Sequence, residues 1–292
     1  MSGHAKLSVA TPVVTMFPRS SGEWEKHATI EDLAQIAEAA DRLGYHHLTC
    51  SEHIALPAAE RGRRGTRYWD PLATFGYLAA RTQRIRLATN VLVLGYHHPL
   101  EIAKRYGTLD QISGGRLILG VGVGSLKEEF DLLGAPFDDR GRRADDALRA
   151  LRASLSVPEP AYQGEFYSFG GMVVDPCTVQ DHVPIWVGGQ TLRSLRRAAT
   201  LAEGWAPFNV RLHQVRDWLG RFEFGPGFDV VLPSPALLDP IGEPERTRDL
   251  LGETAAHGAT IVSAWFRHTS LSHYLESLQA LAELHPPAGG AV

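Results

Sequence analysis

Three glycines alternate at the end of an apolar segment and raise the first question of chemistry. The segment reads GGRLILGVGVGSLKEEF over residues 114–130, with glycines at positions 120, 122 and 124. A dinucleotide-binding turn needs G-x-G-x-x-G, and a P-loop needs G-K before Ser or Thr; this segment has neither. Alternating glycines at a strand end instead mark the close approach of another backbone or a flat ring, or a tightly packed bend. The residues alone leave both interpretations open.

A histidine that follows an acidic residue is the second candidate for chemistry. Glu52 and His53 come directly after the apolar segment HHLTCS, residues 46–51. An imidazole that titrates near neutral pH can donate or accept a proton during catalysis. The same side chain could instead be satisfied by a loop carbonyl, which would make it structural.

A third candidate is the junction of an apolar segment with a helix. The segment PIWVGG (184–189) ends in Gly188 and Gly189, and Gln190 and Thr191 lead into a predicted helix. Backbone N–H groups at the start of a helix form a ready site for an anion. A pair of glycines before a helix is a weak signal when it stands alone.

Other kinds of chemistry are not indicated. The histidine pairs at 46–47 and 97–98 lack the spacing of metal ligands, and no G-x-S-x-G elbow is present, so we expect no metal site and no nucleophilic triad. The net charge of −4 gives no nucleic-acid footprint. With two cysteines, no signal-peptide pattern and no long apolar run, we expect a cytoplasmic protein without a membrane span.

The elements that must position these residues repeat as helix, glycine, strand. Apolar periodicity and end signals predict helices over 29–43, 70–82, 99–112, 191–203 and 243–256. Strands are predicted at 7–13, 46–51, 84–92, 116–122, 184–189, 205–208, 229–235 and 260–266. Eight such units without a linker predict one (β/α)₈ TIM barrel domain over 1–292. A long loop is expected at 53–69, and a short hairpin built from FYSF and MVVD before strand 5.

The longest apolar and glycine-rich stretch resembles a known family. HPLEIAKRYGTLDQISGGRLILGVGVGSLKEEFDLLG (98–134) is similar to the signature segment of the luciferase-like monooxygenase superfamily. It is closest to the branch of coenzyme F420-dependent oxidoreductases. Three further segments resemble that family in the same order: GYHHLTCSEH (44–53), IRLATNVLVLGYHHP (85–99) and PIWVGGQTLRSLRRAATLAEGWAP (184–207). The final third resembles it only in its rhythm of strands and helices.

The resemblance implies a barrel of the bacterial luciferase type with its cofactor at the carboxyl ends of the strands. It implies a non-prolyl cis peptide at Asn90-Val91, forming a bulge behind the cofactor ring. It implies that the ring lies near Gly122, Val123, Gly124 and Ser125, and the phosphate near Gly188, Gly189, Gln190 and Thr191.

The resemblance also implies a catalytic pair: His53 is the proton donor or acceptor, and Glu52 is the acidic residue before it, in a position to orient the histidine. Glu128 and Glu129 are expected to be helix caps and solvated charges. Arginines within 61–67 would form a basic rim for the polyglutamate tail of F420. Of the aromatic and Met side chains Met16, Phe17, Trp24, Trp69 and Trp205, some could line a substrate pocket, although such side chains are more often part of the core.

The expected function is therefore F420-dependent hydride transfer to or from a small organic substrate. An FMN-dependent monooxygenase that uses FMNH₂ and O₂ is the first alternative, and a non-catalytic flavin-binding homologue is the second. The resemblance implies a homodimer. The loops that would choose the substrate carry no recognisable motif.

Overall fold

Every apolar segment predicted as a strand contains one in the computed structural model, which describes residues 5–18 and 20–286. The strands are nearly continuous apolar runs because helices cover one face and the barrel interior buries the other. They are β1 (Lys6–Val9), β2 (His47–Cys50), β3 (Arg86–Thr89), β5 (Leu117–Gly122), β8 (Ile185–Gly189), β9 (Gly204–Pro207), β10 (Asp229–Pro233) and β11 (Ile261–Ala264).

These eight strands close into a parallel ring. The order is β1-β2-β3-β5-β8-β9-β10-β11, and β11 pairs back onto β1, with Lys6 opposite Ile261. The pairing of Leu87 with Leu117 joins β3 to β5 and completes the ring. A further short strand, β4 (Leu92–Val93), pairs with the end of β5 outside the ring. Because all eight strands are parallel, their carboxyl ends meet at one mouth, where barrel enzymes place their active sites.

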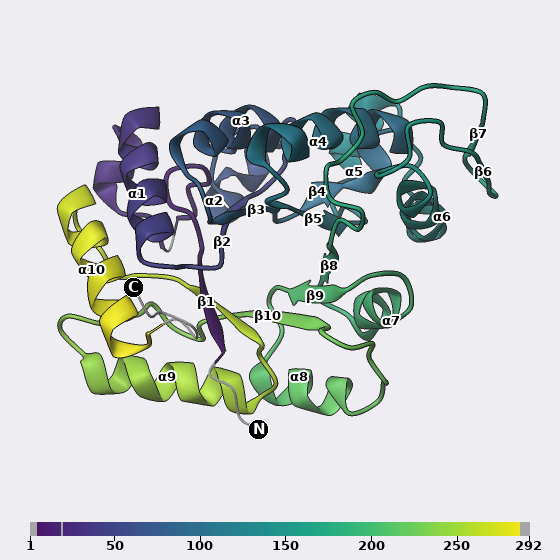
Figure 1. Ribbon diagram of the computed structural model, residues 1–292. Helices are drawn as coiled ribbons and strands as arrows, with labels where there is room; N and C mark the ends of the chain where they lie inside the picture. The colour runs from purple at the N-terminus through teal and green to yellow at the C-terminus, as the bar shows by residue number, and fades with distance from the viewer. Residues whose placement is uncertain (1–4, 19, 287–292) are drawn as a thin grey trace.

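Helices surround the ring on every side in Figure 1. They are α1 (Ile30–Arg42), α2 (Arg61–Arg64), α3 (Pro71–Arg81), α4 (Pro99–Ser113), α5 (Lys127–Leu133), α6 (Arg140–Arg152), α7 (Leu192–Leu201), α8 (Leu212–Leu219), α9 (Pro244–Ala256) and α10 (Leu271–Leu284), with single 3₁₀ turns η1 (Glu23–Lys26), η2 (Ala58–Glu60) and η3 (Leu94–Tyr96). All five predicted helices are present. The helices α2, α5, α6, α8 and α10 had no predicted range, and the segment 53–69 predicted as a long loop contains η2 and α2.

Local sequence signals explain where the helices begin. At α1 the Thr29 hydroxyl accepts from the backbone N–H of Asp32, and the Asp32 carboxylate accepts from the N–H of Thr29, as a capping box requires. Pro71 and Pro99 occupy the first positions of α3 and α4, where a missing N–H costs nothing.

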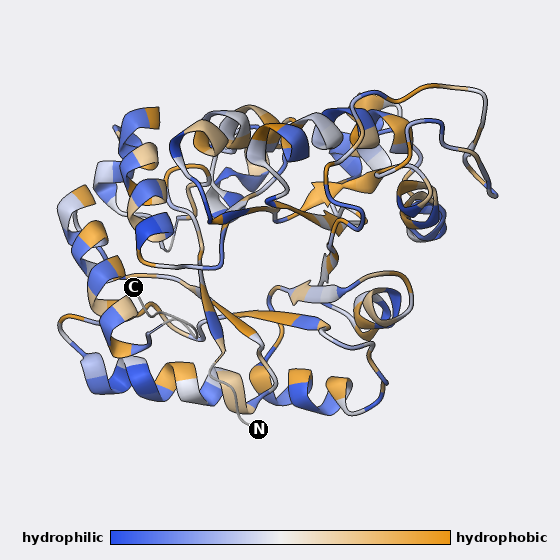
Figure 2. Cartoon of the chain, in the orientation of Figure 1, coloured by the Kyte–Doolittle hydropathy of each residue, from blue (hydrophilic) through white to orange (hydrophobic). Residues whose placement is uncertain are grey.

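Burial follows the hydropathy of the chain. Figure 2 shows mostly hydrophobic strands, while the outer helices carry both hydrophobic and hydrophilic residues. The core lies mainly between the ring and the helices, where Leu33, Phe75, Leu109 and Leu195 are almost fully buried. This layer holds the strands in register and so fixes the positions of the loops at the mouth.

The insertion before β8 differs in detail from the prediction. A two-stranded hairpin is present, but it pairs β6 (Tyr162–Gln163) with β7 (Ser168–Phe169), and MVVD (172–175) forms no strand. The buried Asp146 carboxylate accepts from the backbone N–H groups of Phe166 and Tyr167 and thereby fixes the turn. No described helix has both the length and the apolarity to cross a bilayer.

Candidate active site at the barrel mouth

A cavity of about 1090 Å³ occupies the mouth and extends into the barrel. All twelve residues predicted for the site line it: Glu52, His53, Asn90, Val91, Gly122, Val123, Gly124, Ser125, Gly188, Gly189, Gln190 and Thr191. Ligand sites for small molecules typically enclose about 300–1,000 Å³, so this cavity has room for a tricyclic ring and a second molecule. No group of three or more His, Cys, Asp or Glu placed to hold a metal occurs among the described residues.

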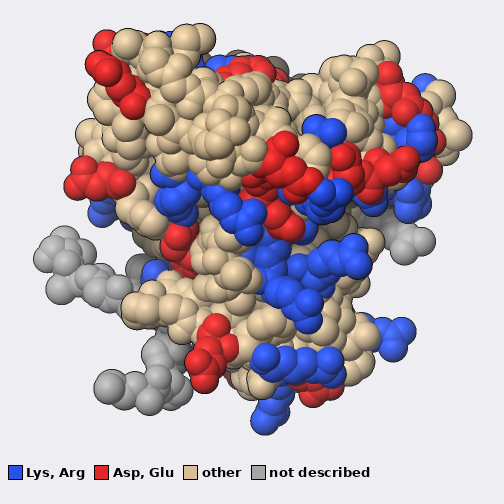
Figure 3. Space-filling view, turned by 90° about the vertical axis from the view of Figure 1, so that its right-hand side faces the viewer, with Lys and Arg blue, Asp and Glu red and all other residues tan. Residues whose placement is uncertain are grey.

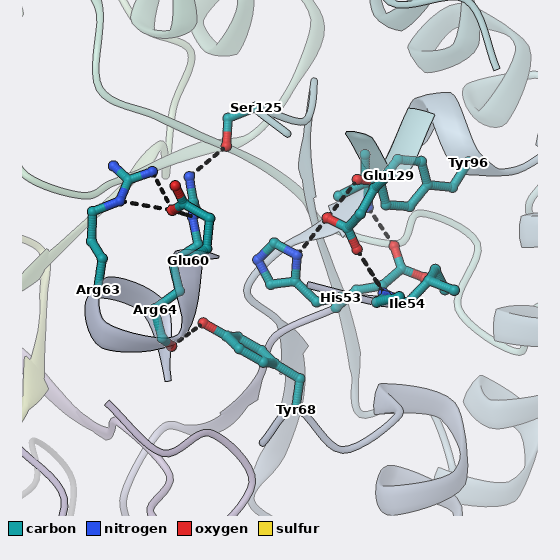
Figure 4. A network of polar contacts seen from close by, with 12 residues as sticks. His53, Ile54, Glu60, Arg63, Arg64, Tyr68, Tyr96, Ser125 and Glu129 are labelled. Atoms are coloured by element: carbon teal, nitrogen blue, oxygen red, sulfur yellow. Dashed lines mark hydrogen bonds and ion pairs between the residues drawn. The ribbon is translucent and has the colours of Figure 1, made fainter. Parts of the chain in front are cut away.

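His53 is held by a carboxylate that lies 76 positions further along the chain. Its Nδ1 lies 2.7 Å from Oε2 of Glu129, in the first turn of α5. The other oxygen of Glu129 accepts from the backbone N–H of Ile54 at 2.8 Å. Figure 4 shows the second ring nitrogen of His53 turned away from Glu129 and toward the cluster of Glu60, Arg63 and Arg64 across the cavity.

Buried hydrogen bonds keep Glu129 charged. Burial alone raises the pKa of this carboxyl, but the hydrogen bond and charge of His53, the N–H of Ala55 and the hydroxyl of Tyr96 outweigh burial. The pKa of Glu129 therefore lies below its usual value of 4.5. A carboxylate only accepts hydrogen bonds, so His53 Nδ1 carries a proton and Nε2 is the nitrogen left to face the cavity.

Two tyrosines contact the His53–Glu129 pair. Tyr96 donates its hydroxyl proton to Glu129 at 3.0 Å, and burial, followed by the Glu129 charge, raises the pKa of Tyr96. The rings of Tyr68 and His53 make a T-shaped contact with 4.5 Å between ring centres, and the Tyr68 hydroxyl donates to the carbonyl of Arg64. Burial raises the pKa of Tyr68 to about 12, so its hydroxyl stays protonated at neutral pH.

Glu52 has a different partner from the one its sequence position indicates. Its Oε1 accepts from Nε2 of His97 at 2.7 Å, and its Oε2 accepts from the backbone N–H of Val93 at 2.7 Å. The Glu52 bond and the neighbouring carboxylates outweigh burial and raise the pKa of His97. The structure thus corrects two expectations: Glu52 orients His97 and not His53, and Glu129 is buried and not solvated.

Val91 occupies the space at the tips of the neighbouring strands. The Asn90–Val91 peptide bond is cis, as expected. A Cβ on Gly122 would lie 2.6 Å from one methyl of Val91, and a Cβ on Gly188 would lie 2.6 Å from the other. The two glycines therefore make room for the side chain of Val91, and Val91 lines the cavity. The three alternating glycines thus have three different close neighbours. A Cβ on Gly120 would lie 1.9 Å from the backbone carbonyl oxygen of Thr89, Gly122 makes room for Val91, and a Cβ on Gly124 would lie 2.5 Å from the ring of Phe130.

The helix start that follows β8 also faces the cavity. Thr191 caps α7 by accepting from the N–H of Ser194, and Gly188 to Thr191 line the cavity beside Arg193. Arg193 is exposed and pairs with no carboxylate in the described part of the chain. The positive end of α7 and this guanidinium together suit an anion.

Of the arginines in the basic loop at 61–67, only some face the cavity. Arg67 donates to the backbone carbonyls of Glu25 and Lys26 and therefore pins η1. Arg63 and Arg64 line the cavity and share the carboxylate of Glu60. Figure 3 shows a second gathering of Lys and Arg across the middle of the face that carries α6 and α7. Arg140, Arg142 and Arg193 line the cavity from that side.

The structure separates lining residues from core residues among the predicted aromatic and Met side chains. Phe17 lines the cavity, whereas Met16, Trp24, Trp69 and Trp205 do not, and Trp205 is fully buried. Sequence reasoning missed Tyr68, Tyr96, Trp265 and the role of Glu129. Tyr68 lies in the predicted loop at 53–69, Tyr96 ends the 3₁₀ turn η3, and Trp265 directly follows β11 at the end of a segment predicted as a strand. For Glu129 the only signal was its place beside Phe130 at the start of a helix.

Comparison with known proteins finds a matching family model, sequence relatives and solved structures with a similar fold. A family model described as luciferase-like monooxygenase matches residues 11–260. An uncharacterized protein of Mycobacterium tuberculosis is 34% identical over 185 residues, which cover 59% of this chain and 66% of that protein, just under two thirds of its length. Monooxygenase RslO1 from Streptomyces bottropensis superposes with a TM-score of 0.75 at 24% identity, over 96% of this chain and 98% of that one. The coenzyme F420-dependent tetrahydromethanopterin reductase from Methanopyrus kandleri has a TM-score of 0.75 at 15% identity, over 96% and 98%.

Proposed function

This chain belongs to the luciferase-like monooxygenase family, and on that premise we propose that it is an oxidoreductase whose barrel mouth binds a deazaflavin or flavin, with coenzyme F420 as its cofactor. The observation that carries the proposal is the His53–Glu129 pair, which turns one imidazole nitrogen toward a cavity of about 1090 Å³. The small organic substrate would bind in the same cavity.

The residues present fit such a cofactor. Gly122 and Gly188 leave space that Val91 fills, so the strand tips offer an apolar surface of one methyl-bearing side chain between two glycines. The N-terminus of α7 with Arg193 offers a place for the phosphate, and Arg140 extends the same rim. Val91 and the two glycines would hold the cofactor ring. The start of α7, with Arg193 and Arg140, would hold the anionic tail of the cofactor. When bound, reduced F420 would supply a hydride to the substrate and oxidised F420 would accept one from it, whereas reduced FMN in a monooxygenase would supply electrons for the use of O₂.

The residues of the chain would transfer the proton, orient the histidine and exclude water. His53 Nε2 would donate or accept the proton that accompanies electron transfer. Glu129 would hold His53 in one orientation and one tautomer, which makes Glu129 a positioning residue. Val91 and the loop aromatics would exclude water from the reacting atoms.

The basic rim favours F420 over FMN. F420 carries a polyglutamate tail in addition to its phosphate, and Arg140, Arg142 and Arg193 line the cavity on the side where α7 begins. Arg142 is paired with Glu165, whereas Arg140 donates to the backbone carbonyls of Gly124 and Phe137 and has no carboxylate partner in the described part of the chain. A longer anion can therefore use more of this rim than FMN can.

Titration of the purified protein with F420 and with FMN tests the choice of cofactor. We expect a dissociation constant of roughly micromolar order for F420 and weaker binding of FMN. Micromolar binding of FMN without binding of F420 would overturn the choice of cofactor and favour the monooxygenase. That alternative has one independent marker: its turnover consumes O₂, which an oxygen electrode measures.

A further inference from the structure

The order of the strands places the loop after β1 and the turn after β8 on opposite sides of the barrel mouth. In the ring of eight strands, β8 lies four positions from β1, so the turn after β8 faces the loop after β1 across the mouth. The proposed anion site, Gly188 to Thr191, comprises the end of β8 and the turn after it. A cofactor anchored there leaves the opposite side, formed by the loops after β1, β2 and β11, for a second molecule.

Of the Phe, Tyr and Trp side chains that line that opposite side, three are only partly buried, one from each of these loops, whereas Phe266 and Tyr274 are buried. We call Phe17, Tyr68 and Trp265 the aromatic wall. The Phe17 ring centre lies 6.3 Å from that of Tyr68, edge to face, and 5.6 Å from that of Trp265. All three are only partly buried, unlike the fully buried core rings of Phe75 and Trp205. The wall therefore keeps apolar ring surface available to a ligand.

Backbone contacts hold the wall in place. The loops after β1 and β2 pair at Thr15 and Tyr68, and the N–H of Trp69 donates to the carbonyl of Val14 at 2.9 Å. Gly65 has φ +80°, and a Cβ there would lie 1.8 Å from the carbonyl oxygen of Met16. The two loops thus meet without room for a side chain between them, and the wall is set before any ligand arrives.

A cationic group and His53 border the aromatic wall. Arg64 lines the cavity, and its backbone carbonyl accepts from the Tyr68 hydroxyl (Figure 4). Arg63 and Arg64 share one carboxylate, that of Glu60, which leaves one positive charge unbalanced in this cluster. The remaining contact of the Arg64 guanidinium is a long 3.4 Å hydrogen bond to the hydroxyl of Ser125. Because Glu60 accepts only from Nε and Ser125 holds Nη2 weakly, the outer N–H groups of Arg64 can bind an anionic oxygen.

We infer that the aromatic wall and Arg64 form a substrate subsite for a planar aromatic compound that carries an acidic oxygen, as an aromatic carboxylate or phenol does. The ring would pack against Phe17 and Trp265, and the oxygen would bind Arg64 beside His53. Its role as a substrate subsite rests on the proposed function, whereas binding at the wall can be measured without it.

Three probes of similar size test the subsite by calorimetry on the full chain. 2-Naphthoate is flat and charged, decahydro-2-naphthoate is charged but not flat, and 2-naphthamide is flat but not charged. We expect 2-naphthoate to bind about tenfold more tightly than either of the others, because aromatic stacking and the charged hydrogen bond each contribute on the order of 1 kcal/mol. Equal binding of all three probes would overturn the inference.

Matched variants locate the binding. Phe17→Leu should weaken 2-naphthoate about tenfold and leave decahydro-2-naphthoate unchanged, whereas Phe169→Leu, a half-buried ring in β7 outside the cavity, should change neither. Arg64→Met should weaken 2-naphthoate but not 2-naphthamide, with Arg61→Met, also in α2 but outside the cavity, as its control. Equal effects of a variant and its control would contradict the subsite.

The same preparations separate this inference from the proposed function. F420 and FMN are titrated into the wild type and into Phe17→Leu. Retained cofactor binding with loss of 2-naphthoate binding supports both proposals. Binding of 2-naphthoate without binding of either cofactor would overturn the proposed function and leave the aromatic subsite standing.

Discussion

At the residue scale, the pairing of His53 with Glu129 decides the chemistry of the mouth. The sequence points to His53 because of its type and its place after a strand, but it cannot identify its partner. Glu52 is adjacent in the chain, yet alternate residues after a strand point in different directions, and its carboxylate meets His97. Nor does the sequence say which of Glu128 and Glu129 faces inward, since the choice depends on how α5 packs.

Neutralising Glu129 should lower turnover. We expect Glu129→Gln to reduce kcat by about 10- to 100-fold, because the amide holds His53 without a charge and permits the wrong tautomer. The Michaelis constant for the cofactor should change little. Steady-state kinetics and the pH dependence of kcat measure this effect.

Glu128→Gln is the matched control, because Glu128 is the exposed neighbour in the same turn. It should keep wild-type turnover and the wild-type pH profile. An equal loss in both variants would point to damage to α5 and contradict a positioning role for Glu129.

The depressed pKa of Glu129 also predicts a dependence of stability on pH. A carboxyl with a folded-state pKa below 4.5 stabilises the fold above its unfolded pKa, and this contribution is lost as pH falls through the folded value. Between about pH 5 and pH 3, the free energy of unfolding should fall less steeply in Glu129→Gln than in the wild type. Denaturant titrations at several pH values measure the slopes, and parallel slopes would contradict the stated pKa direction.

At the element scale, the strands were predictable and the connections were not. Continuous apolar runs such as LILGVG identify buried parallel strands, and capping residues such as Thr29 mark where helices begin. In contrast, α6 begins without a side-chain cap, and its first turns are charged. The hairpin register depends on Asp146, which a local pattern cannot reveal because the carboxylate lies on another element.

The fit of Val91 between two strand tips can be tested by substitution. Gly188→Ala should destabilise the fold by about 1–3 kcal/mol and weaken cofactor binding, because its Cβ would lie 2.6 Å from a methyl of Val91. Val91→Ala removes that methyl, so the double variant should recover most of the stability. A double-mutant cycle measured by denaturant unfolding gives the coupling; additive losses would show that the two positions do not interact.

The junction of the loops after β1 and β2 makes a second prediction at this scale. Gly65→Ala should destabilise the fold by about 1–3 kcal/mol, because its φ of +80° disfavours a side chain and the methyl would meet the Met16 carbonyl. Gly62→Ala is the control, since a Cβ there meets nothing within 4 Å. Thermal unfolding compares the two. A Gly65→Ala variant as stable as Gly62→Ala would contradict the close approach.

At the scale of the whole molecule, eight units of strand and helix were enough to predict a closed barrel. Closure itself depends on the pairing of β3 with β5, two strands that β4 separates along the chain. Length and strand count favoured the ring, but the pairing and the extra strand outside it could be seen only in three dimensions. The homodimer stays a prediction, which light scattering in solution can decide.

The central claim is that this mouth holds a tricyclic redox cofactor against Val91, within reach of His53. A crystal structure of the protein grown with F420 tests it most directly, with a parallel crystal grown with FMN. The account predicts one of the two rings packed on Val91, its phosphate at the start of α7, and His53 Nε2 facing the ring or the substrate space beside it. A mouth that stays empty with both cofactors, or a ring bound elsewhere on the molecule, would contradict it.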